Sequence, residues 1–244
     1  IAQLQRVIDA KWISQRDAEK LAGRLNFLTQ AVAGQSGASR LSRLYHIVNA
    51  GRSNVGRGLE KDLKWWQQFL ISKKSRSHVV IGPRRKAASL YTDAQGGGGI
   101  GGVLYLEDNE PKQFGIKVGD EFTGLFGQRR TFIVPLELLA VTVGLYLFRR
   151  ELVGTRVQFF IDNRPVLFCL RKGRCKKEDI NCLVLLTVDI AASLGVCIFK
   201  WVPSNLNVAD PPSRSQLLPG VETVPCKSQV VQVVRSLALL LQES

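Results

Sequence analysis

Four acidic residues stand in settings where their carboxylates could act together. Asp93 and Asp162 each end an apolar run of β-branched or aromatic residues, Glu137 lies within the pattern of an amphipathic helix, and Asp210 follows a loop rich in Pro and Asn. Carboxylates at the ends of strands can meet at one edge of a sheet, where their oxygens suit Mg²⁺. Paired divalent ions held this way catalyse phosphodiester cleavage by binding both the attacking and the leaving oxygen. The pattern therefore predicts a nuclease.

Each of the four acids also has a simpler interpretation. An isolated Asp or Glu most often lies solvated at the surface, and Asp210 could serve only as the cap of a helix. The prediction depends on all four occurring in order, in matching local settings.

The elements that would position these acids change character along the chain. Residues 1–72 have helical apolar spacing, which predicts helices over 1–13, 15–32, 39–50 and 59–70, with a break at Gly34-Gln35-Ser36-Gly37. Residues 73–86 are polar and basic and predict a linker.

From residue 87 the pattern favours strands at 88–93, 100–106 and within 113–122, separated by a turn at 108–111. A helix over 135–150, a strand over 157–161, helices over 165–170 and 180–194, and a strand over 196–202 follow. Asp210 begins or caps a further helix. This order predicts an α/β layer structure. The tail from residue 216 has helical apolar spacing over 229–241.

Charge is concentrated in the first part of the chain. The net charge is +14, and residues 1–92 carry 17 Lys/Arg against 5 Asp/Glu. A basic surface of this kind favours a nucleic-acid phosphate backbone as the partner, although it could also serve only solubility.

Other features of the composition narrow the setting of the chain. The five cysteines form no CxxC pair and no apolar run spans a bilayer, so we expect an intracellular protein of the cytoplasm or nucleus, neither secreted nor bound to a membrane. The sequence contains no Met and begins with Ile1, so we expect a piece of a longer reading frame.

The segments that hold the four acids resemble the RNase H domain of retroelement reverse transcriptases. The resemblance covers roughly residues 88–215 and is carried by Tyr91-Thr92-Asp93-Ala94 with the glycines after it, by Leu136-Glu137-Leu138-Leu139-Ala140-Val141, by Ile161-Asp162-Asn163, and by Trp201-Val202-Pro203-Ser204 with Asn207-Val208-Ala209-Asp210 and Ser213-Arg214. Upstream, segments 20–27 and 62–70 resemble the thumb or connection region of such enzymes. Trp65-Trp66 favours elements of the DIRS type or related gypsy-like elements.

The resemblance implies an RNase H-like fold, a mixed five-stranded sheet flanked by helices, preceded by a small helical segment. The expected divisions are a thumb/connection-like segment with a basic linker (1–86), an RNase H-like domain (87–215) and a C-terminal tail (216–244). The implied activity is hydrolysis of the RNA strand of RNA–DNA hybrids, with Asp93, Glu137, Asp162 and Asp210 holding two Mg²⁺ ions that Mn²⁺ can replace. The paired-aspartate motif of the polymerase is absent, so the implied partner besides the hybrid is the missing polymerase portion of the same polyprotein.

Nucleic-acid contacts are expected at two further places. Asn163 lies beside Asp162, where a 2′-hydroxyl distinguishes RNA from DNA. The densest basic run contains Arg171, Lys172, Arg174, Lys176 and Lys177. It lies between two predicted helices, where some family members place a basic substrate-binding protrusion, although charge runs are more often solvated surfaces.

The sequence departs from the family pattern at Pro211-Pro212, where related elements commonly have Leu, and the loop at 203–208 has no His. Proline restricts the backbone of the residue before it, which makes Asp210 the weakest of the four assignments. The glycine run at 96–102 lacks the Lys and the following helix of a phosphate-binding loop, so it predicts a β-hairpin tip. Two other hypotheses remain: a decayed domain that only binds or positions nucleic acid, and another nuclease or transposase of the same fold.

Overall fold

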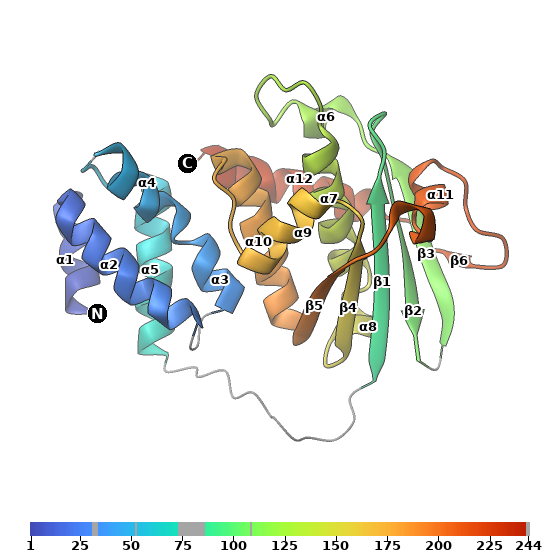
Figure 1. Ribbon diagram of the computed structural model, residues 1–244, viewed down its shortest axis with the longest axis horizontal. Helices are drawn as coiled ribbons and strands as arrows, with labels where there is room; N and C mark the ends of the chain where they lie inside the picture. Colours follow the sequence, from blue (N-terminus) through green and yellow to red (C-terminus); the bar gives the residue numbers. More distant parts are fainter. Residues whose placement is uncertain (31–33, 52, 73–85, 108, 243–244) are drawn as a thin grey trace. The chain divides into compact units, whose positions relative to one another are not determined.

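The computed structural model describes residues 1–30, 34–51, 53–72, 86–107 and 109–242. Its contacts divide the chain into two compact units (Figure 1). The first unit contains Ile1–Val80, Lys172–Leu185 and Leu239–Ser244, and the second contains Ile81–Arg171 and Leu186–Ala238. Residues 73–85 of the predicted basic linker lie outside the described residues.

The first unit is built from amphipathic helices, as the spacing of apolar residues predicts. Its helices are α1 (Ala2–Ala10), α2 (Gln15–Leu28), α3 (Gly34–Ser39), α4 (Ser42–Ala50) and α5 (Arg57–Ile71). The apolar faces of α1, α2, α4 and α5 form one buried cluster, in which Trp66 is fully enclosed and Trp65 and Phe69 pack at its border. Trp66 therefore belongs to the core of this unit, and Trp65 packs against it with its ring stacked on Phe69.

One helix of the first unit was not expected. The sequence predicts a break at residues 34–37, whereas α3 forms through Gln35, Ser36 and Gly37. The left-handed conformation is confined to Gly34, whose φ is 56°. The helical turn after it has a side-chain bond, because the Ser39 hydroxyl donates to the Ser36 carbonyl at 3.0 Å.

The second unit is a mixed sheet with helices packed on it, which confirms the predicted α/β fold class. The strands are β1 (Ala87–Ala94), β2 (Gly99–Leu106), β3 (Asn109–Lys117), β4 (Arg156–Ile161), β5 (Val196–Trp201) and β6 (Glu222–Thr223). They lie in the order β5-β4-β1-β2-β3-β6 (Figure 1). The neighbours β1–β2 and β2–β3 are antiparallel, whereas β1–β4, β4–β5 and β3–β6 are parallel. The sheet has six strands rather than the predicted five because the tail contributes β6.

The third strand begins earlier than predicted. Residues 109–111, expected in a turn, belong to β3, and the register between β2 and β3 shifts between Leu104 and Leu106. Pro111 lies in this irregular stretch. A bulge is one of the few places where a sheet accepts a proline, which has no N–H to donate.

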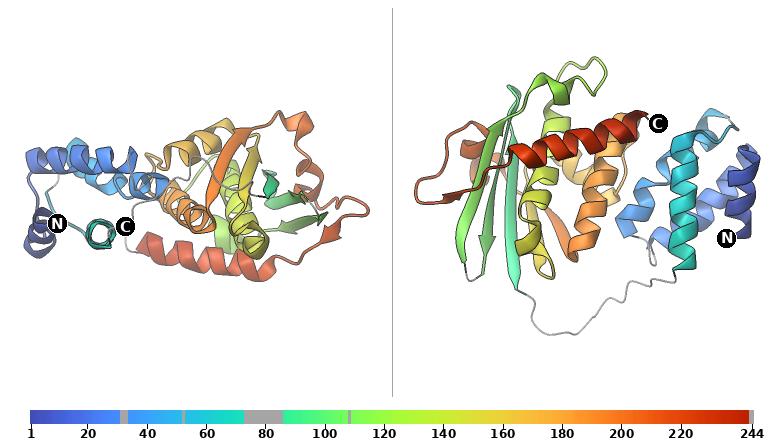
Figure 2. Two further views of the ribbon diagram at one scale, coloured as in Figure 1. Left: turned by 90° about the horizontal axis from the view of Figure 1, so that it is seen from below. Right: turned by 180° about the vertical axis from the view of Figure 1, so that it is seen from behind.

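Helices pack on this sheet, mainly on one face. They are α6 (Asp120–Thr123), α7 (Ile133–Leu147), α8 (Arg149–Leu152), α9 (Arg164–Lys172), α10 (Glu178–Leu194), the 3₁₀ turn η2 (Ser204–Leu206), α11 (Asp210–Ser213) and α12 (Lys227–Gln242). Gly144 of α7 faces Leu90 and Thr92 of β1, whereas α11 packs on the opposite face. The tail helix α12 lies beside α7 (Figure 2). Among the described residues, no helix is both long and apolar enough to span a bilayer.

Candidate active site

The sheet topology places Asp93 and Asp162 at the same edge. Strands β1 and β4 are parallel neighbours, and Tyr91 pairs with Phe160, so each acid lies two residues beyond a member of that pair. The rings of Tyr91 and Phe160 are stacked, with their centroids 4.5 Å apart. Because parallel strands end at one edge of a sheet, this register brings the two carboxylates together.

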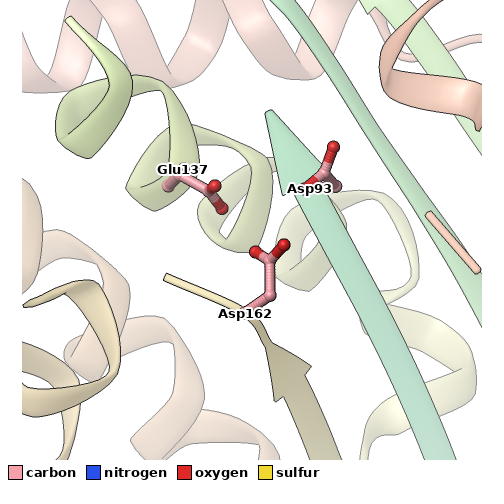
Figure 3. A group of neighbouring side chains, drawn as sticks. All are labelled: Asp93, Glu137 and Asp162. Carbon is pink, nitrogen blue, oxygen red and sulfur yellow. The ribbon is translucent and has the colours of Figure 1, made fainter. Parts of the chain in front are cut away.

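Glu137 joins them from the first half of α7. One carboxylate oxygen from each of Asp93, Glu137 and Asp162 lies within 4.8 Å of the others (Figure 3). Asp93 and Glu137 are buried, at 4% and 3% exposure, although α7 was expected to be amphipathic. The helix is instead buried from Pro135 to Leu145. The acid therefore lies within a nearly apolar helix, which is unfavourable for a charge unless a partner is supplied.

Two groups of the chain hold Glu137 in place. Its carboxyl accepts hydrogen bonds from the Asn163 side chain and from the Ala94 backbone N–H. The Asn163 oxygen Oδ1 in turn accepts from the Val166 N–H at 3.2 Å, at the start of α9. Asn163 thus links the end of β4 to α7. Its predicted contact with nucleic acid stays a prediction.

Burial and repulsion between like charges act strongly on the carboxyls of Glu137 and Asp93. Burial, together with the charges of Asp93 and Asp162, raises the pKa of Glu137 to about 9. The pKa of Asp93 is raised to about 6, again mainly by burial, although a hydrogen bond from Ser213 opposes the shift. A cation at the centre of the three acids would relieve both effects.

The donor set fits a hard divalent cation. Two buried oxygens of this group, Glu137 Oε2 and Asp162 Oδ1, have no hydrogen-bond partner among the described residues. Buried carboxylate oxygens without donors are costly, and oxygen-only ligand sets are typical of Mg²⁺ and Mn²⁺ sites. The three acids are therefore compatible with divalent metal binding.

Asp210 lies outside this group of three. Arg214 holds it in a bidentate ion pair, with Nε 3.0 Å and Nη2 2.9 Å from Asp210 Oδ1 and Nε 3.1 Å from Oδ2. Its side chain is 42% exposed. It is nevertheless near enough for its charge to contribute to the raised pKa of Asp93. Its role as a metal ligand stays a prediction.

The two prolines after Asp210 are compatible with the local backbone. Helix α11 is a single turn whose N-cap is Ala209 and whose first residue is Asp210, so Pro211 and Pro212 occupy its second and third positions. Proline is tolerated there because those N–H groups have no partner within the helix. The departure from the family pattern therefore does not distort the start of α11.

The basic run is divided between the two units. Arg171 belongs to the second unit and donates through Nε to the Phe199 carbonyl at 2.9 Å. Lys172, Arg174, Lys176 and Lys177 belong to the first unit, where the Arg174 guanidinium lies 4.7 Å from the centre of the Tyr45 ring. Lys172, Lys176 and Lys177 are exposed.

Several residues around the acids escaped the sequence-based assignment. The Ser213 hydroxyl donates to Asp93 Oδ2 at 2.6 Å. The Trp201 indole N–H donates to the Asp162 carbonyl at 3.2 Å, and the Arg164 guanidinium lies 4.8 Å above the Trp201 ring. Trp201 and Ser213 lie within motifs that carry the family resemblance, but a single sequence does not reveal which acid each one contacts.

Comparison with known proteins finds solved structures that resemble this chain, but no match by sequence. No protein-family model matches the chain, and no curated protein matches it. Among solved structures, RNase H1 from Halobacterium salinarum is 16% identical with a TM-score of 0.41, over 54% of this chain and 98% of that one. The N-terminal RNase H domain of a Mycobacterium tuberculosis protein is 17% identical with a TM-score of 0.42, over 60% and 97%. LC11-RNase H1, solved in complex with an RNA/DNA hybrid, is 16% identical with a TM-score of 0.38, over 52% and 93%.

Proposed function

We propose that the chain is an endoribonuclease that hydrolyses the RNA strand of RNA–DNA hybrids with the help of two divalent metal ions. The observation that carries this proposal is the group of Asp93, Glu137 and Asp162, whose oxygens converge while two of these oxygens stay buried without a donor from the described part of the chain. A structural role would be expected to pair such acids with a cation of the chain. A buried group of acids that has no cationic partner among the described residues is typical of a functional site.

Each residue of the proposed site would have a distinct role. Asp93, Glu137 and Asp162 would hold the metal, with Asp210 completing the set after release from Arg214. Bound divalent ions supply a hydroxide nucleophile and neutralise charge on the phosphate and on the leaving oxygen. The buried residues of α7 around Glu137 would hold the carboxylates in place and limit their solvation. The hydrogen bond from Asn163 would fix the orientation of the Glu137 carboxyl. The expected products carry a 5′-phosphate and a 3′-hydroxyl.

The wider setting is also proposed from the sequence motifs. The resemblance of residues 20–27 and 62–70 to a thumb or connection region supports a place for the chain in a retroelement reverse transcriptase. Its partner there would be the polymerase portion of the same polyprotein.

A second candidate function is binding without cleavage. The observation that favours it is the ion pair that occupies Asp210, since a set of four ligands is incomplete while Arg214 holds one of them. In this case the domain would only position the hybrid.

The direct test is cleavage by the purified chain of a hybrid labelled on either strand, with Mg²⁺ or Mn²⁺, beside matched duplex DNA and duplex RNA. Cleavage confined to the RNA strand of the hybrid supports the proposal. Binding of the hybrid without cleavage supports the second candidate, and cleavage of duplex DNA identifies a different nuclease of the same fold.

A further inference from the structure

The turn α11 lies unusually close to the sheet. It packs on β1, β2 and β3 near the acid-bearing edge (Figure 1). A Cβ atom added to Gly101 would lie 2.6 Å from the Pro212 carbonyl carbon, and one added to Gly115 would lie 2.5 Å from the Pro212 carbonyl oxygen. A Cβ on Gly99 would overlap the Ser213 carbonyl oxygen. Only glycine permits this approach of two backbones.

These glycines form one surface, which we call the glycine seat: Gly99, Gly101 and Gly115. Gly101 and Gly115 are partners across β2 and β3. The seat accounts for two members of the glycine run at 96–102, which had predicted only a hairpin tip. It also gives Pro212 a place, because this residue is buried against the two partner glycines.

The seat places Ser213 against Asp93. Gly101 is the strand partner of Asp93, and the backbone of Ser213 lies where a side chain of Gly101 would be. Ser213 is 1% exposed, and its hydroxyl donates to Asp93 Oδ2 at 2.6 Å. A hydroxyl has one proton, which fixes one oxygen of the carboxylate and therefore its rotation.

We propose that Ser213, seated by the three glycines, is a positioning residue that holds the Asp93 carboxylate in its metal-binding orientation. The proposal rests on the proposed function only in assuming that Asp93 binds metal. Groups that orient a metal ligand commonly contribute about 10- to 100-fold to metal affinity or activity.

A purely structural role for Ser213 must be distinguished from positioning. The same hydroxyl lies 2.8 Å from the Asp210 carbonyl, within its own turn. If this bond were the important one, loss of the hydroxyl would loosen α11 and lower the melting temperature but leave the intrinsic metal affinity unchanged.

The test measures Mn²⁺ affinity by calorimetry, melting temperature, and kcat and KM for hybrid cleavage, on the full chain and on Ser213→Ala. We expect Mn²⁺ affinity to fall about tenfold and kcat to fall with it, with KM for the hybrid and the melting temperature nearly unchanged. Ser213→Cys, which keeps the size but has a weak donor, replaces the alanine variant if that variant does not fold. Unchanged Mn²⁺ affinity in the folded variant overturns the proposal.

A pair of glycine variants tests the seat itself. Gly101→Ala should displace α11 and weaken Mn²⁺ binding at least as much as Ser213→Ala. Gly96→Ala, in the same glycine run, has open space around its added Cβ and should leave Mn²⁺ affinity unchanged. Equal Mn²⁺ affinity in both glycine variants would contradict the seat.

The two proposals fail in different ways. A wild-type chain that binds Mn²⁺ but cleaves no hybrid removes the proposed function and leaves the role of Ser213 to the calorimetric comparison. A wild-type chain that cleaves hybrid while Ser213→Ala binds Mn²⁺ equally well removes the role of Ser213 alone. A wild-type chain that binds no Mn²⁺ overturns the role of Ser213.

Discussion

Each unit of the chain buries acidic side chains, but the partners of these side chains differ between the two units. In the first unit Asp62, at 4% exposure, accepts a hydrogen bond from Arg43 Nη1 at 2.9 Å, and Arg43 also pairs with Glu178. In the second unit Glu137 is buried to a similar degree among other acids, and the donors that it has within the described part of the chain, the Asn163 side chain and the Ala94 N–H, are neutral.

The pKa values follow this difference. Burial raises the pKa of Asp62 only to about 6, because Arg43 opposes the shift. Burial and two like charges raise the pKa of Glu137 to about 9. Burial alone therefore does not identify a functional acid. Among the residues that the structure describes, Glu137 has no cationic partner, and this distinguishes the candidate active site from a structural ion pair.

The largest expected effect comes from removing one acid of the unpaired group. Asp93→Asn should lower kcat for hybrid cleavage on the order of 10³-fold or more, because a metal ligand is removed, while hybrid affinity stays the same. Cleavage of labelled hybrid and fluorescence anisotropy measure the two quantities. Asp9→Asn, at an exposed acid of α1, is the control, and full activity of Asp93→Asn would sink the assignment.

Replacing the acid of the buried ion pair in the first unit should instead lower the stability of the protein. Asp62→Asn removes a charge partner of buried Arg43 and should lower the free energy of unfolding by roughly 3 kcal/mol at neutral pH. Urea denaturation followed by circular dichroism measures it. If the decrease were no larger than that of Asp9→Asn, the contrast between the two sites would disappear.

Glu137→Gln should stabilise the protein at high pH, whereas Asp62→Asn should destabilise it. A folded-state pKa raised to about 9 means that the folded protein holds a proton that the unfolded chain releases above about 4.5, so stability falls as pH rises between these values. Removing the carboxyl should therefore raise the melting temperature by a few degrees at pH 8 without metal, and not at pH 4. Added Mg²⁺ should stabilise the wild type and not the variant. A lower melting temperature for the variant at pH 8 without metal would contradict this.

Exposed charges should have the smallest effect, confined to binding. Replacing Lys176 and Lys177 with Ser should reduce the slope of log affinity for hybrid against log salt by about 0.9 for each phosphate that these lysines neutralise in the wild type. Anisotropy titrations over a range of salt concentrations measure the slope. Asp93→Asn, which keeps all the basic residues, should retain the wild-type slope, and an unchanged slope in the double lysine variant would rule out contact with the backbone of the hybrid.

The sequence predicted what depends on local pattern and missed what depends on contact between distant residues. The apolar runs before Asp93 and Asp162 predicted two strands, and parallel pairing then required their ends to meet. Nothing local indicated that Ser213 would reach Asp93, because that contact depends on glycines in β2 and β3. The pairing of Asp210 with Arg214 followed ordinary helical spacing, yet the competing metal-ligand interpretation obscured it.

Strand β3 is covered by residues of the C-terminal tail, and this cover has a practical consequence. Gln113 of β3 is completely buried, its amide donates to the carbonyls of Leu218 and Val221, and β6 pairs alongside. A chain cut after Ser215 would keep Asp93, Glu137, Asp162 and Asp210 but would remove the residues that cover β3. An uncovered strand offers its backbone to neighbouring molecules, so such a truncation should form aggregates through strand-to-strand association before its activity could be assayed.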